Sequence, residues 1–187
     1  MEILSPFSKE NVDADSRAFA ALMHHLREMD GADHTVMMVQ VENEIGMIAD
    51  SRDRSAIADR LFNETAPFEL MNYLQQNKDG LIPEFSSVWA ANGFKTRGTW
   101  EEVFGRGPGT DEIFLAWYFA CYVNRVAEAG KAEYPLPMYV NAALIRPGYQ
   151  PGQYPSAGPL PHLMDVWRAG APKIDFSIAR HLLSELY

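Results

Sequence analysis

The sequence is poor in the features that define several large classes of protein. It has one cysteine, Cys121, so no disulfide can form within the chain. Its longest apolar run, from Ile113 to Val123, is well short of the ~20 residues that a bilayer-spanning helix needs. The first residues, Met1 to Leu4, lack the basic start and long apolar stretch of a signal peptide. These absences predict neither a disulfide scaffold nor a membrane protein, and they leave the localisation of the protein open.

Positive charge is also scarce. Sixteen Lys and Arg residues stand against 25 Asp and Glu residues, which gives a formal net charge of −9. Nucleic acids and anionic membrane surfaces would repel such a chain. The charge therefore predicts no nucleic-acid or membrane partner, whereas a neutral sugar is compatible with it.

Motifs for metals, nucleotides and common nucleophiles are missing. His24 and His25 are adjacent on a predicted helix and point apart, and the other histidines show no ligand spacing. The glycine-rich segment Gly105–Gly109 lacks the Lys-Ser/Thr of a nucleotide-binding loop and is interpreted as an ordinary loop. No Gly-x-Ser-x-Gly elbow is present, and Cys121 lies in an apolar helix, where a buried thiol is expected. The sequence thus predicts no cofactor.

The pattern that is present predicts an α/β fold. At 187 residues the chain is long enough for one domain with a buried core, and residues 1–187 are interpreted as a single domain. Helices are expected over 12–29, 56–62, 66–76, 111–129, 162–169 and 178–187, and strands over 35–44, 136–144 and 173–176, with 79–109 less regular. Thr65 and Thr110 are expected to cap the helices that follow them. The helix over 111–129 starts with the acidic Asp111 and Glu112, has a middle that is apolar on nearly all sides, and is expected to end at Gly130. The alternation of these helices and strands predicts a parallel sheet with covering helices.

Polar side chains end the first of these strands. The run from Thr35 is dense in valine and methionine, which is typical of a strand buried on both faces, and it ends in Glu42, Asn43 and Glu44 before Gly46. Active sites of parallel α/β proteins form at the carboxyl ends of strands. Asn141 is placed in the same way at the end of the strand over 136–144. We therefore expect a site that contains these side chains.

Simpler interpretations remain open for each candidate. Glu44 fits an ordinary carboxylate at a strand end, and Asn43 and Asn141 fit turn residues. Trp89 and Tyr154 are able to stack on a sugar ring, as is Trp100, but side chains of these types more often pack in cores and loops.

The octapeptide Val39–Gly46, Val-Gln-Val-Glu-Asn-Glu-Ile-Gly, resembles the acid/base strand of the β-galactosidases of glycoside hydrolase family 35. That family belongs to a clan of retaining glycosidases with (β/α)8 barrels. The resemblance implies that Glu44 is the general acid/base and that Asn43 contacts the sugar beside the scissile bond. Ile45 stands where the family commonly has Tyr, so the chain resembles a divergent member.

The resemblance also implies a partial TIM barrel. A complete barrel takes ~250 residues and eight strands, whereas three strands are predicted here. The chain is therefore expected to be the central portion of a glycoside hydrolase domain, without its N- and C-terminal strands. In the family, the segment similar to Pro172–Phe176 is followed by more barrel and by the nucleophilic Glu, and this continuation is not recognisable after Ser177.

Three functions follow as expectations. The first is retaining hydrolysis of terminal β-galactosides, with Glu44 as acid/base, Asn43 and Asn141 as substrate-binding residues, and a carbohydrate as partner. The second is a catalytically incompetent barrel fragment that lacks the nucleophile. The third is a clan relative that acts on another β-glycoside. Glu42 would share a strand face with Glu44, roughly 7 Å away at two rises of ~3.3 Å, and is expected to support the site rather than to attack the sugar.

Overall fold

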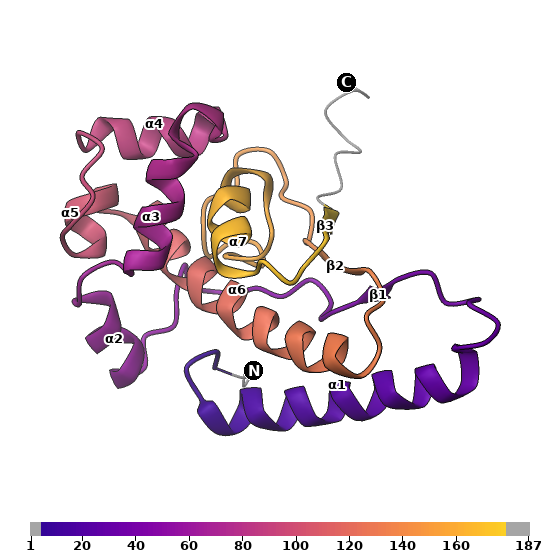
Figure 1. Cartoon of the computed structure of the whole chain (residues 1–187). Helices are drawn as coiled ribbons and strands as arrows, with labels where there is room; N and C mark the ends of the chain where they lie inside the picture. The colour runs from indigo at the N-terminus through magenta and orange to yellow at the C-terminus, as the bar shows by residue number, and fades with distance from the viewer. Residues whose placement is uncertain (1–4, 179–187) are drawn as a thin grey trace.

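The computed structural model describes residues 5–178 (Figure 1). The helices are α1 (Lys9–Asp30), α2 (Ala56–Phe62), α3 (Phe68–Gln76), α4 (Pro83–Ala91), α5 (Trp100–Phe104), α6 (Pro108–Glu133) and α7 (Met164–Gly170), with the 3-10 turns η1 (Lys78–Gly80) and η2 (Pro161–Leu163). The strands are β1 (Val39–Gln40), β2 (Met138–Asn141) and β3 (Phe176–Ile178). The fold is a mostly helical α/β arrangement, and this confirms the predicted class in its coarse form.

The strands form an open parallel sheet in the order β1-β2-β3. Gln40 of β1 is paired with Tyr139 of β2, and Asn141 of β2 with Ile178 of β3. Along β2, Met138 and Val140 are buried while the residues between and after them are half-buried, so one face of this strand lies against the core. Within residues 5–178 the sheet does not close into a barrel.

Helix α6 is the centre of the molecule. Its side chains are buried on nearly all sides, as its apolar middle predicted. Helices α1 and α7 lie on opposite sides of it, and α2 to α5 gather near its N-terminal end (Figure 1). The buried apolar side chains form one connected cluster around it. No helix in the stretch from residue 5 to 178 has the length and apolarity to cross a membrane.

Two glycines allow neighbouring helices to approach α6 closely. A Cβ atom at Gly130 would lie 2.3 Å from the Phe19 ring of α1, and one at Gly170 would lie 2.7 Å from Cβ of Ala120. The prediction that Gly130 ends the helix is therefore wrong. The helix continues to Glu133, and the glycine serves the contact between α1 and α6.

The predicted helix starts were less accurate than the helices themselves. Helix α6 begins at Pro108, so Thr110 lies inside its first turn, where its hydroxyl donates to the Gly105 carbonyl instead of capping the helix. Helix α3 is preceded by Pro67, and Thr65 does not cap it. Pro108 occupies the first position of α6, where its missing N–H costs nothing, whereas Pro67 is the residue that precedes α3.

The segment over 79–109 is more regular than expected. It contains α4, which starts with Pro83, and α5, which starts with a capping box between Thr99 and Glu102. The aromatic side chains of this segment are core residues: Phe85, Trp89, Trp100 and Phe104 are all buried. Both helices are short, so their apolar positions span too few turns to show a helical period.

The other predicted elements are found with shifted ends. Helix α1 starts at Lys9, after the Ser8 cap, and α2 matches its predicted bounds. Strand β3 lies further along the chain than the predicted strand over 173–176. Apart from Ile178, which belongs to β3, the helix predicted over 178–187 lies outside the described residues.

Candidate functional site

The strand that carries the site is shorter than predicted. Val41 is buried and its N–H donates to the Tyr139 carbonyl at 2.8 Å, after which the chain turns. Glu42 and Glu44 have left-handed backbone conformations, with φ of 61° and 50°. Upstream, Met37 is 74% exposed, so the run is not buried on both faces. The prediction of a continuous strand to Glu44 is therefore wrong at both ends.

The turn places Asn43, Glu44 and Asn141 together, as the sequence predicted. Asn141 Oδ1 accepts the backbone N–H of Glu44 at 2.9 Å, and Asn141 Nδ2 donates to Asn43 Oδ1 at 3.2 Å. Because β1 and β2 are parallel neighbours, these residues share the carboxyl edge of the sheet. A residue that sequence reasoning missed joins them: Gln40 Nε2 donates to Asn43 Oδ1 at 3.0 Å and to the Glu42 carbonyl at 2.9 Å.

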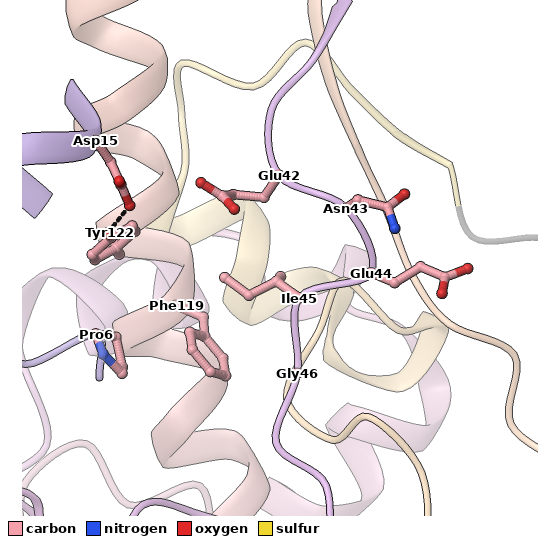
Figure 2. A pocket seen from close by; sticks show the side chains of 9 residues that line it. All are labelled: Pro6, Asp15, Glu42, Asn43, Glu44, Ile45, Gly46, Phe119 and Tyr122. Atoms are coloured by element: carbon pink, nitrogen blue, oxygen red, sulfur yellow. Dashed lines mark hydrogen bonds between the residues drawn. The ribbon is translucent and has the colours of Figure 1, made fainter. Parts of the chain in front are cut away.

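The two glutamates of the turn point in opposite directions. Figure 2 shows Glu42 directed toward Asp15 and Tyr122, whereas Asn43 and Glu44 extend to the other side of the backbone. The expectation that Glu42 and Glu44 share one face is wrong, because left-handed residues interrupt the alternation of an extended strand. Glu44 and Asn43 are exposed and available to a ligand.

A cavity of about 300 Å³ lies on the Glu42 side of the turn. It is lined by Pro6, Asp15, Glu42, Asn43, Glu44, Ile45, Gly46, Phe119 and Tyr122 (Figure 2). The Tyr122 hydroxyl donates to the Asp15 carboxylate, so α1 and α6 are joined at the cavity wall. This role of Asp15 was not predictable from sequence, because one acidic residue on an amphipathic helix has the same pattern as any solvated one.

Electrostatics differ between the two sides of the turn. Glu42 is exposed as a residue, as Asn43 and Glu44 are, but its carboxyl group lies against the cavity wall, where partial desolvation raises its pKa and the negative charge of Asp15 adds to the rise. Burial and the hydrogen bond to Asp15 likewise raise the pKa of the Tyr122 phenol. Cys121 of α6 is partly buried and packs against the core, in place of the fully buried thiol expected, and desolvation raises its pKa to about 12.

The loop after β2 covers the segment that follows the turn. Met47 and Ser156 form a two-way backbone bridge, with N–O distances of 2.9 and 2.8 Å. The buried Glu112 of α6 holds the loop, since its carboxylate accepts the backbone N–H of Ala157 at 3.1 Å and lies 2.8 Å from Nε2 of His162. The long segment 146–161 is thus tied to the residues next to the site.

The aromatic candidates do not contribute to the site. Trp89, Trp100 and Tyr154 are between 0% and 6% exposed, so none presents a ring face for a sugar. The loop interpretation of Gly105–Gly109 holds for its first residues, since Gly105 and Gly107 have positive φ, and Pro108 then starts α6. Across the part of the chain that the structure describes, no three His, Cys, Asp or Glu side chains are grouped so as to hold a metal ion.

No protein-family model and no curated protein sequence matches the chain. What can be said of its function therefore comes from its residues and their geometry.

Proposed function

We propose that the chain is a β-galactosidase-like retaining glycosidase of the family 35 type, with Glu44 as general acid/base. Its parallel sheet would be the central part of a (β/α)8 barrel, with β1, β2 and β3 as consecutive barrel strands. The observation that carries the proposal is the hydrogen-bonded group of Asn43, Glu44 and Asn141 at the carboxyl edge of two adjacent parallel strands. Barrel glycosidases use this edge for catalysis.

The position of Glu44 supports the proposed role of general acid/base. Its side chain is exposed and its backbone N–H donates to Asn141, and the carboxyl group extends to the side of the backbone opposite Glu42 (Figure 2). A ligand bound above the sheet edge on that side would meet this carboxyl group. A general acid there protonates the departing glycosidic oxygen, and the resulting carboxylate then takes a proton from the attacking water. Asn43, on the same side of the backbone, would contact the 2-hydroxyl of the sugar.

The nucleophile remains unassigned in this proposal. Retaining enzymes need a second carboxylate about 5–5.5 Å from the acid. Glu42 does not suit this role, because it points to the opposite side of the turn (Figure 2). Its direction favours the second candidate function, a catalytically incompetent fragment that at most binds carbohydrate.

The purified chain assayed with a panel of aryl β-glycosides separates the two candidates. Turnover of the β-galactoside supports the enzyme, and turnover of another glycoside alone indicates a clan relative. A folded chain without turnover on any member of the panel rules out the enzyme and leaves the incompetent fragment.

If the chain is active, Glu44→Gln should lower kcat by about 10²- to 10⁴-fold, the usual contribution of general acid–base catalysis. Glu42→Gln is the matched control, since it removes a carboxylate from the same turn but on the other side. Equal losses in the two variants would remove Glu44 from the mechanism. Substrates with poorer leaving groups should show the larger loss, because they depend more on protonation.

A further inference from the structure

The amide of Asn141 has a fixed orientation. Its Oδ1 faces the backbone N–H of Glu44 at 2.9 Å, and a backbone N–H can only donate. The oxygen of the Asn141 amide must therefore point to Glu44, which leaves its NH2 group facing Asn43 Oδ1 at 3.2 Å. The polarity of a backbone group thus sets which end of the Asn43 amide meets Asn141.

Gln40 reaches the same oxygen from the other strand. Its Nε2 lies 2.9 Å from the Glu42 carbonyl, which can only accept, so the NH2 end of the Gln40 amide must face the turn. The same nitrogen donates to Asn43 Oδ1 at 3.0 Å. Two NH2 groups, each oriented by a separate backbone group, therefore converge on one oxygen. A flipped Asn43 would bring three NH2 groups together without an acceptor.

We propose that Gln40 and Asn141 are positioning residues that hold the Asn43 amide in one orientation, with its NH2 group directed outward. The site then presents a hydrogen-bond donor beside Glu44 and binds an acceptor oxygen of its ligand. That the ligand is a sugar rests on the proposed function, whereas the orientation itself rests only on the contacts above.

The same contacts change the role expected for Asn141. Both ends of its amide already bond within the protein, to Glu44 and to Asn43. It holds the turn from the neighbouring strand, and the ligand contact is made by Asn43. Gln40 completes this support from within the turn's own strand.

The orientation is testable by NMR on the full chain labelled with ¹⁵N. The side-chain NH2 signals are assigned by their loss in Gln40→Met, Asn43→Asp and Asn141→Asp. The NH2 protons of Gln40 and Asn141 should exchange with water up to about tenfold more slowly than those of Asn43, the factor that one hydrogen bond supplies. Slower exchange at Asn43 than at the other two would overturn the proposal.

Substitutions of Gln40 test the positioning role by its chemistry. Gln40→Met removes the donor with little change of size. It should not slow the exchange of the Asn43 NH2 protons, but it should broaden or double the Asn43 NH2 signals, because the amide then samples both orientations. Gln40→Lys restores a donor and should return a single set of signals. Gln75→Met, on the exposed surface of α3, is the control and should leave Asn43 unchanged. An identical, single Asn43 signal in all three variants would overturn the role of Gln40.

A ligand titration keeps this proposal separate from the proposed function. Methyl β-D-galactopyranoside should shift the Asn43 NH2 signals, and Asn43→Asp, which still accepts from both neighbours but offers no donor, should weaken binding by about tenfold. If the exchange pattern holds and no galactoside shifts these signals, the positioning stands and the glycosidase proposal fails. If galactoside is bound or hydrolysed with unchanged constants in Gln40→Met and Asn141→Asp, the positioning fails.

Discussion

The surroundings of α6 and the turn at the carboxyl edge of the sheet are built in opposite ways. Around α6, apolar side chains are almost fully buried, and the Phe114 ring lies 5.0–5.7 Å from the rings of four other aromatic residues. At the turn, the side chains are polar, and Glu42 and Glu44 hold backbone conformations that non-glycine residues rarely adopt.

The difference indicates that the core around α6 stabilises the fold, whereas the turn at the sheet edge carries the candidate chemistry. Burial of apolar surface around α6 supplies the free energy of folding. The turn lowers the free energy of folding gained there, because each left-handed residue destabilises the fold by on the order of 1 kcal/mol and persists only where its surroundings enforce it. Such strain is typical of functional sites, and here it directs Glu42 and Glu44 to opposite sides of the chain. The predictions below test this division, from the largest expected effect to the smallest.

Phe114→Ala should give the largest loss of stability. The side chain is fully buried and its ring packs edge-on against Phe62 and Trp100. Truncation leaves a cavity, and we expect a loss of about 3–5 kcal/mol in the free energy of unfolding measured with urea. Phe68→Ala, which removes a ring that is 76% exposed, is the control and should change stability little. Similar losses in both variants would contradict a core centred on α6.

Gly130→Ala should destabilise the contact between α1 and α6. The added methyl group would lie 2.3 Å from the Phe19 ring, and overpacking of this kind costs about 1–3 kcal/mol. In the same helix, Gly109→Ala meets no atom within 4 Å and should stabilise by about 0.5–1 kcal/mol, since alanine favours the helix. Thermal melts of the two variants should therefore shift in opposite directions. A stabilised Gly130→Ala variant would show that the helices separate freely.

Glu44→Gly should raise stability while removing the candidate acid. Glycine adopts a φ of 50° without strain, so the free energy of unfolding should rise by up to about 1 kcal/mol. Glu64→Gly is the matched control at a residue without positive φ, and it should lower stability. A lower melting temperature for Glu44→Gly would show that the turn is not strained at this residue.

Glu42→Gln should give the smallest effect, and one that depends on pH. Partial desolvation and Asp15 raise the pKa of Glu42 above its ordinary value of 4.5, so the folded protein holds this proton more tightly than the unfolded chain does. The associated stability is complete below pH 4.5 and is lost as the pH rises through the raised pKa. The glutamine variant, which stays neutral, should be more stable than the parent at pH 7.

Urea denaturation at pH 7 and at about pH 4 checks this sign, because the advantage of the variant should vanish at the lower pH. Asp15→Asn should lower the pKa of Glu42 and reduce the same advantage. A difference that grows toward acid would contradict the raised pKa.

Much of the helical part was predictable from sequence, because periodic apolar residues and capping residues act locally. Helix α2 has its predicted bounds, and α6 was recognised from its apolar middle and the acidic residues near its start. The exact ends failed where a non-local contact decides them. Gly130 looked like a helix stop and is instead the point at which α1 touches α6.

The candidate site was predicted in part. The grouping of Asn43, Glu44 and Asn141 followed from the rule that parallel strands end at one edge, which needs no knowledge of side-chain direction. The opposite directions of Glu42 and Glu44 did not follow, because an extended strand was assumed where the backbone is left-handed. Gln40 was missed since its role depends on a hydrogen bond to a side chain beyond the strand.

The backbone bridge between Met47 and Ser156 ties the lengths of two loops to each other. Next to it, a Cβ atom at Gly46 would lie 2.6 Å from the Pro155 backbone, so the two segments have no slack between them. Adding or deleting a residue in one loop would shear the paired segments and swing Glu44 away from Asn141. Sequence changes at this edge should therefore be substitutions, with the number of residues from Glu44 to Met47 and from Asn141 to Ser156 preserved.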